Sequence, residues 1–211
     1  MLKRNKESFS APARFSGSGH CLWKMNKFYT VGHSTRKIED FISILKTHRI
    51  EVLVDVRAFP VSTRNPHFNQ DNLESSLIQE GIEYFWSGKE LGGYRKKSNG
   101  LGELSPNKGW ETEGFRIYAD HMMSDSFKMA VNRLVDLAKE RTVACMCAEK
   151  YYWRCHRRLI SDYLISLGYE VWHIIEPDSL RKHELTKFAR VKEGVLCYPD
   201  EDSAEPSLFK T

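Results

Sequence analysis

Apolar residues in this chain follow two alternating patterns: short continuous runs, and stripes in which apolar positions recur every three or four residues. Runs of β-branched and aromatic residues predict strands, and the stripes predict helices. The predicted strands cover residues 28–31, 52–56, 82–86, 142–146 and 170–175. The second run, Val-Leu-Val-Asp-Val, is almost continuously apolar, which is typical of a strand buried on both faces.

The helical stripes lie between these runs. They cover residues 38–45, 73–78, 115–121, 127–137 and 155–167. Strands that alternate with helices predict a single three-layer α/β domain, with a mostly parallel sheet of about five strands flanked by helices. Residues 87–112 are rich in glycine, lysine and arginine. We expect a long loop there, and such loops in compact domains are usually functional or mobile.

The 211 residues suit one domain with short tails. We assign residues 27–199 to the α/β domain, residues 1–26 to a disordered N-terminal extension, and residues 200–211 to an acidic C-terminal tail. The extension is rich in serine, glycine and basic residues, so a transit peptide is an alternative interpretation. It lacks the apolar or amphipathic periodicity of targeting segments, however.

Composition narrows the functional classes only modestly. A formal net charge of +4 permits an anionic partner, including nucleic acid, without requiring one. Five cysteines, an odd number, occur without a secretory signal, which favours a cytoplasmic protein with reduced thiols. No apolar run approaches the ~20 residues that a membrane helix needs, so we expect no membrane partner. The oligomeric state does not follow from the sequence.

Reactive side chains gather directly after the predicted strands. In a parallel α/β sheet the carboxyl ends of the strands share one edge, and ligands bind there. The first strand is followed by His33 and Ser34, and the second ends at Asp55 and Arg57. The third and fourth strands lead to Glu90, Gly92 and Gly93, and to Cys147, Glu149, Cys155, His156 and Arg157. We therefore predict a site at this edge.

Cys155 is the strongest candidate for a nucleophile. It falls at the predicted start of a helix, where the macrodipole is positive. Arg154, Arg157 and Arg158 add positive charge around it. A thiol in such a position is expected to have a lowered pKa, and the neighbouring His156 is a natural general acid or base.

Structural interpretations stay open for several of these residues. Cys147 could be a small apolar residue of the core, and His33 and Ser34 could be turn residues. A carboxylate at the end of an apolar strand is costly unless it is paired. Asp55 could therefore form a purely structural ion pair with Arg57, two positions away.

Familiar nucleotide and metal motifs are absent. There is no Walker loop and no Gly-x-Gly-x-x-Gly after the first strand, and the six residues between Cys147 and Arg154 do not match a tyrosine-phosphatase loop. Zinc sites normally separate paired cysteines by two to four residues, whereas seven separate Cys147 from Cys155. A metal bound by Cys147, Cys155, His156 and His33 stays open as an alternative, but we assign no metal and no cofactor.

Short motifs in a fixed order run through the chain from about residue 28 to residue 199. They are Val31-Gly32-His33-Ser34-Thr35, Asp55-Val56-Arg57 with Pro60 and Phe68, Gly81-Ile82-Glu83-Tyr84, Leu91-Gly92-Gly93, Gly114-Phe115-Arg116 with Tyr118 and Ala119, Met146-Cys147-Ala148-Glu149, Cys155-His156-Arg157, His173-Ile174, and His183, Leu185, Thr186, Ala189 and Tyr198-Pro199. At these residues the chain resembles the domain-of-unknown-function 488 family. The resemblance implies a compact α/β domain with a site that carries cysteine, histidine and glutamate, and it implies no particular reaction.

One segment departs from the family pattern. The family usually has a proline between the two cysteines, and here Tyr151-Tyr152-Trp153 takes its place. We therefore expect a different loop shape, with aromatic faces offered to a ligand.

The residues and the resemblance together define the predicted site. The predicted catalytic residues are Cys147, Glu149, Cys155, His156, His33 and Asp55. The predicted substrate-binding residues are Ser34, Arg57, Gly92, Gly93, Arg116, Tyr118 and Arg157.

The favoured function is an enzyme, a hydrolase or transferase, that acts on a small anionic substrate resembling a phosphate or a nucleotide. Either thiol could be the nucleophile, and Glu149 could replace it as nucleophile or base. One alternative is a nucleic-acid-binding module that uses the basic loop and aromatic side chains for charge and stacking; these are Trp86, Tyr94, Trp110, Tyr151, Tyr152 and Trp153. The other alternative is a thiol redox or metal sensor that couples Cys147 with Cys155.

Overall fold

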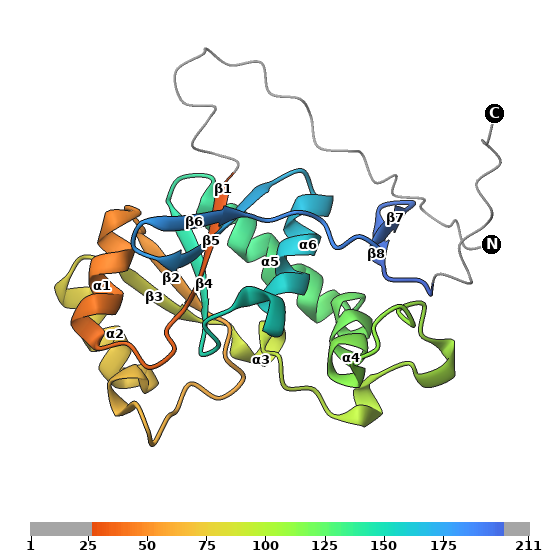
Figure 1. The fold of residues 1–211 in the computed structure, drawn as a ribbon, viewed down its shortest axis with the longest axis horizontal. Coiled ribbons are helices and arrows are strands. Elements are labelled where there is room, and N and C mark those ends of the chain that lie inside the picture. Colours follow the sequence, from red (N-terminus) through yellow and green to blue (C-terminus); the bar gives the residue numbers. More distant parts are fainter. Residues whose placement is uncertain (1–26, 201–211) are drawn as a thin grey trace, which may run out of the picture.

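The computed structural model of the chain describes residues 27–200, and its centre is a six-stranded sheet of order β3-β2-β4-β1-β5-β6 (Figure 1). The five parallel strands are β1 (Lys27–Gly32), β2 (Val52–Asp55), β3 (Glu83–Trp86), β4 (Val143–Cys147) and β5 (Glu170–Glu176). The sixth strand, β6 (Ser179–Lys182), is antiparallel to β5. The predicted fold class, a mostly parallel α/β sheet, is confirmed.

Six helices connect and cover the strands: α1 (Ile38–Thr47), α2 (Gln70–Gln79), α3 (Gly88–Leu91), α4 (Glu113–Met122), α5 (Asp125–Ala138) and α6 (Arg157–Ser166). Short 3-10 turns lie at Pro66–Phe68, Lys97–Asn99, Gly102–Leu104 and Tyr152–Arg154. Figure 1 shows α1 and α2 on one side of the sheet and α5 and α6 on the other. The three predicted layers are therefore present.

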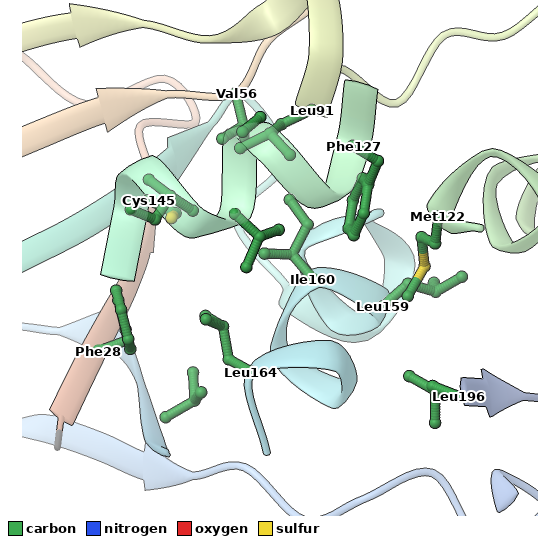
Figure 2. Packing of buried hydrophobic residues seen from close by; sticks show 14 of the residues in the cluster. Phe28, Val56, Leu91, Met122, Phe127, Cys145, Leu159, Ile160, Leu164 and Leu196 are labelled. Carbon is green, nitrogen blue, oxygen red and sulfur yellow. The ribbon is translucent and has the colours of Figure 1, made fainter. Parts of the chain in front are cut away.

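Successive strand positions face opposite helical layers, as period-two side chains must. In β2, Val52 and Val54 pack in one buried cluster and Leu53 packs in the other. The cluster on the α5 and α6 side appears in Figure 2, which labels Phe28, Val56, Leu91, Met122, Phe127, Cys145, Leu159, Ile160, Leu164 and Leu196. The prediction of a strand buried on both faces therefore holds for β2, whose four residues are all buried.

The structure adds elements that the apolar pattern did not predict. All four residues of β6 are exposed, so no apolar pattern marks them. A small hairpin of β7 (Arg190–Lys192) and β8 (Val195–Cys197) follows. The predicted loop at residues 87–112 contains α3 and two of the 3-10 turns. The predicted N-terminal extension and nearly all of the acidic tail lie outside the described residues.

No helix within residues 27–200 is long and apolar enough to cross a membrane.

The parallel register carries the ends of β1, β2 and β4 to a common edge. Gly32 at the end of β1 is level with Cys147 at the end of β4. The ladder continues beyond the strands, because the His33 amide donates to the Cys147 carbonyl at 2.9 Å and the Val56 amide donates to the Met146 carbonyl at 2.9 Å. The loops that follow these strands therefore begin side by side, as predicted.

Candidate active site

A cleft of about 840 Å³ opens at this edge of the sheet, within the usual size range of small-molecule sites. Nine predicted site residues line it: His33, Ser34, Arg57, Gly93, Tyr118, Cys147, Glu149, Cys155 and His156. The four other predicted site residues do not line the cleft; they are Asp55, Gly92, Arg116 and Arg157. The edge that the sequence indicated is therefore the edge where the cleft lies.

Cys155 and His156 form a pair at the inner wall of the cleft. The Cys155 Sγ atom lies 3.5 Å from His156 Nδ1, and both residues are buried. The other ring nitrogen, Nε2, lies 3.0 Å from the carbonyl oxygen of Val56. Because a carbonyl only accepts hydrogen bonds, Nε2 carries a hydrogen and Nδ1 faces the sulfur. The pair has the arrangement of a nucleophile beside an oriented base.

The two thiols of the cleft have opposite tendencies to ionise. Burial raises the pKa of Cys155, but a hydrogen bond from Cys147 and the His156 and Arg157 side chains bring it well below its ordinary value. The hydrogen bond to Cys155, together with burial, raises the pKa of Cys147 well above its ordinary value. The two sulfurs lie within 4.8 Å of each other, and Cys155 is the one whose pKa is lowered.

Cys155 lies at the N-terminal end of helix α6, two residues before its first residue. Helix α6 begins at Arg157, and Cys155 has the extended backbone of the residue that ends the preceding 3-10 turn. Its carbonyl oxygen accepts from the Arg158 amide at 3.0 Å. Burial raises the pKa of Cys155, and among the side chains that lower it Cys147 comes first.

Gly93 allows the His156 ring to lie where it does. A Cβ atom on Gly93 would lie 2.4 Å from His156 Nδ1 and 2.8 Å from Cγ. Nonbonded heavy atoms prefer separations near ~3.5–4.0 Å, so any side chain here would displace the imidazole. The predicted role of Gly93 in substrate binding is thus accompanied by a role in packing.

Replacing Gly93 with Ala is expected to slow the alkylation of Cys155 at pH 7 by about tenfold, because a displaced imidazole no longer stabilises the thiolate and an ordinary thiol is only a few per cent ionised there. Site-resolved mass spectrometry of iodoacetamide labelling measures the rate. Gly114→Ala is the matched control, because Gly114 also lines the cleft and a Cβ there meets nothing within 4 Å. Equal rates in the two variants would contradict the assigned role of His156.

Asp55 and Arg57 form the ion pair that the sequence left open. Arg57 Nε lies 2.9 Å and 3.0 Å from the two carboxylate oxygens of Asp55, and the Tyr84 hydroxyl donates to the same carboxylate at 2.8 Å. Asp55 is fully buried. Asp55 does not line the cleft, and it acts on the cleft by orienting Arg57.

His33 belongs to the same group. Its Nδ1 donates to the Ser34 carbonyl at 2.9 Å, and its Nε2 accepts from Arg57 Nη1 at 3.2 Å. The ring also stacks on Phe68, with centroids 4.1 Å apart. Burial and the Arg57 charge lower the pKa of His33 to about 3. Both nitrogens are therefore engaged in a neutral ring, which positions Arg57 at the cleft wall.

Arg157 holds the loop after β4 from its buried side. Its guanidinium is buried, and Nη2 donates to the carbonyl oxygens of Glu149 and Lys150. A Cβ on Gly32 would lie 2.0 Å from the Glu149 carbonyl oxygen, so the two loops meet backbone to backbone. Arg157 was predicted to bind substrate, and instead it positions the loop that carries Cys147 and Glu149.

A chain of buried hydrogen bonds extends from Arg157 into the protein. Arg157 donates to Thr30 Oγ1 at 3.4 Å, and Thr30 donates to His173 Nδ1 at 2.6 Å. His173 Nε2 then donates to His183 Nδ1 at 2.9 Å, and His183 Nε2 donates to Asp162 at 2.9 Å. Arg157 only donates and Asp162 only accepts, and a neutral His173 with its hydrogen on Nε2 joins them in one direction. Burial, with the His183 and Arg157 charges, lowers the pKa of His173 to about 2.

Positive charge dominates the cleft wall. Four cationic side chains line it, Arg57, Arg64, Lys150 and Arg154, against one acidic side chain, Glu149. Within residues 27–200, neither Arg64 nor Arg154 has an ion-pair partner. Neither was among the predicted site residues, although Arg154 was named for its charge beside Cys155; the only sequence signal of Arg64 is its place in the loop after β2.

Cys147, Cys155 and His156 also form the one group of potential metal ligands found among the described residues, with one atom from each within 4.8 Å of the others. His33, the fourth member of the metal hypothesis, has both ring nitrogens engaged by protein partners. The Arg157 guanidinium already supplies positive charge to both thiols. The thiolate is therefore stabilised by the protein itself.

The aromatic segment between the cysteines does not line the cleft. Tyr152 is buried and stacks on His173, with centroids 3.4 Å apart. Tyr151 and Trp153 stack on each other at 4.7 Å. Trp110, another aromatic of the nucleic-acid alternative, is also buried. Two of the six predicted aromatics are therefore used inside the protein, Trp86, Tyr94 and Trp153 are exposed, and this loop offers no ring to the cleft.

Comparison with known proteins identifies a family without an assigned reaction. A family model described as a domain of unknown function, DUF488, matches residues 37–164, which is more than half of the 211-residue chain. No curated protein and no solved structure matches the chain. The matched segment contains α1 and most of α6 and includes every residue of the cleft except His33, Ser34 and Thr35. The chain belongs to the DUF488 family.

Proposed function

We propose that this protein is a cysteine-dependent enzyme, a hydrolase or transferase, that acts on a small anionic substrate. The observation that carries the proposal is the Cys155–His156 pair, with Sγ 3.5 Å from Nδ1, at the wall of a cleft with four cations and one acid. A low-pKa thiolate beside an imidazole is the usual arrangement for nucleophilic catalysis by cysteine.

The proposed reaction has two steps. The Cys155 thiolate attacks the electrophilic atom of the substrate, a bond from Sγ to that atom forms, and the bond to the leaving group breaks. His156, protonated on Nδ1, gives its proton to the leaving group. Water or a second acceptor then attacks the covalent intermediate while His156 takes the proton from it, and the Cys155 thiolate is released.

Cys147 has a supporting role in this proposal. Its sulfur lies within 4.8 Å of Cys155, and it lowers the pKa of Cys155, so it stabilises the thiolate before attack. Glu149 is exposed at the cleft, and one of its carboxylate oxygens accepts from the Tyr151 amide at 3.2 Å. That contact shapes the loop, so we assign the nucleophile to the sulfur.

The anionic nature of the substrate rests on charge. Arg57 is neutralised by Asp55, and Lys150 forms an ion pair with Glu176. Arg64 and Arg154 are exposed, line the cleft and have no ion-pair partner among residues 27–200. Guanidinium groups bind carboxylate and phosphate oxygens in bidentate fashion, so these two arginines are the proposed anion contacts.

The proposal is tested by the rates at which two reagents of different charge alkylate Cys155. Iodoacetate is anionic and iodoacetamide is neutral, and site-resolved mass spectrometry separates Cys155 from the other thiols. We expect a midpoint pH for Cys155 well below the ~8.5 of a free thiol. At low salt we also expect a higher ratio of iodoacetate to iodoacetamide rates than free glutathione shows, and added salt should reduce it.

Two variants test whether Arg64 and Arg154 cause the preference for iodoacetate. The double variant Arg64→Ala and Arg154→Ala is expected to remove the preference for iodoacetate. Lys89→Ala, which alters an exposed cation outside the cleft, should keep it. An ordinary midpoint pH at Cys155 would overturn the thiolate mechanism, and a rate ratio equal to that of glutathione would overturn the anionic substrate.

A further inference from the structure

Exposed apolar side chains gather at the same cleft. Phe59, Val61 and Tyr94 line it, yet they are 64%, 70% and 65% exposed. The rings of Phe59 and Tyr94 contact each other, with centroids 5.5 Å apart and planes inclined at 56°. Exposed apolar residues that cluster at a cleft mark binding sites more often than isolated ones do. We call Phe59 and Tyr94 the aromatic lip.

The two segments that carry the lip are held close together. A Cβ on Gly92 would lie 2.7 Å from the Cα atom of Ala58, so the turn before Tyr94 packs directly on the residue before Phe59. The Trp86 ring nitrogen donates to the Arg57 carbonyl at 2.9 Å. These contacts place the lip without a ligand, and a preplaced aromatic face costs little ordering on binding.

Tyr118 anchors the segment that carries Tyr94. Its hydroxyl donates to the Leu91 carbonyl at 2.7 Å, and its ring is completely buried. Arg95 donates to the Lys89 and Glu90 carbonyl oxygens at 2.9 Å and 2.6 Å. The turn that presents Tyr94 is therefore fastened on both sides, although Tyr94 itself is exposed.

Cationic groups lie next to this aromatic surface. Arg64 belongs to the same loop as Phe59, and Arg154 lines the cleft beside Cys155. A ligand that used both features would carry a planar ring and an anionic group. We propose that the cleft binds a free nucleoside monophosphate, with the base against Phe59 and Tyr94 and the phosphate at Arg64 and Arg154. The inference rests on the anionic substrate proposed above and adds the ring.

The dimensions and aromatics favour a free nucleotide over a nucleic-acid strand. A strand-binding groove needs a row of stacking faces for successive bases. Here Trp110 and Tyr152 are buried, and Tyr151 and Trp153 stack on each other. One aromatic pair in a cleft of about 840 Å³ suits one base.

Calorimetric titration of the reduced full-length protein tests the inference. The probes are AMP, GMP, CMP and UMP, with ribose 5-phosphate as the anion without a base and decathymidylate as the strand. We expect at least one nucleotide to bind about tenfold or more tightly than ribose 5-phosphate. Phe59→Ser and Tyr94→Ser should each remove most of that difference and leave ribose 5-phosphate binding unchanged.

Leu104→Ser is the matched control, because Leu104 is 87% exposed and does not line the cleft. Ribose 5-phosphate binding as tightly as every nucleotide would overturn the aromatic lip, and decathymidylate binding far more tightly at the same salt would overturn the free nucleotide. If no nucleotide binds more tightly than ribose 5-phosphate but the preference of Cys155 for iodoacetate persists, the proposed function stands without the nucleotide. If that preference is also absent, both fail. Cys155→Ser should bind the probes normally, which separates binding from thiol chemistry.

Discussion

Replacing Asp55 with Asn is expected to lower the free energy of unfolding by about 3 kcal/mol, because it removes one partner of a buried ion pair and leaves Arg57 charged at the cleft wall. Arg57 is 5% exposed and Asp55 is fully buried, so water cannot replace the lost carboxylate. The same change leaves the Tyr84 hydroxyl opposite an amide. A loss of that size is a large share of the ~5–15 kcal/mol that stabilises a typical domain.

Urea unfolding at pH 7 measures this difference. Glu83→Gln is the matched control, because it breaks an ion pair with Arg141 in which the two side chains are 46% and 36% exposed. Exposed pairs contribute about 0–1 kcal/mol. Similar losses in the two variants would mean that Arg57 reaches water when its partner is removed, and the assigned role of Asp55 in orienting Arg57 would then be wrong.

The free energy of unfolding is expected to fall by about 2 kcal/mol for each of two buried histidines when the pH drops from 7 to 5. His33 has a pKa of about 3 and His173 a pKa of about 2 in the folded protein, both lowered mainly by burial. In the unfolded chain both titrate near ~6.5. Below that pH the unfolded state binds more protons, so stability is present above about 6.5 and is lost as the pH falls toward the folded values.

The window between pH 5 and 6.5 avoids most carboxyl titration, because unfolded carboxyl groups titrate lower, near ~4. His121, whose pKa burial also lowers, adds to the slope in the same direction. His33→Gln is expected to reduce the slope of unfolding free energy against pH, whatever it does to stability at pH 7. Nitrogen NMR provides a second readout, in which the His173 ring should stay neutral at pH 5 with its hydrogen on Nε2. A charged His173 at that pH would contradict the one-directional hydrogen-bond chain.

Local sequence patterns predicted where the site lies better than they predicted the role of each of its residues. The position of a residue after a parallel strand was sufficient to place His33, Cys147 and Cys155 at one edge, because strand direction determines where the loops begin. The side-chain partners could not be predicted in this way. Arg157 looked like a substrate ligand by its charge, but it is buried and donates to backbone carbonyl oxygens.

One physical reason explains why sequence reasoning missed some residues of the cleft. Arg64 and Phe59 lie in a loop whose residues follow no period, so no pattern marks which of their side chains face the cleft. Tyr94 was named only as a stacking residue of the nucleic-acid alternative. The buried chain from Thr30 through His173 to Asp162 joins strands and a helix far apart in sequence. Such contacts depend on the packing of the layers.

The amino-acid sequence by itself determined the alternation of strands and helices, the predominantly parallel sheet and the edge where reactive groups gather, because period and strand direction are local properties. Only the tertiary structure decided that Cys147 lies beside Cys155, that Arg57 contacts a neutral His33, and that Arg64 and Arg154 have no ion-pair partner within residues 27–200. Ionisation and exposure depend on neighbours that the fold brings together, and these neighbours come from separate loops.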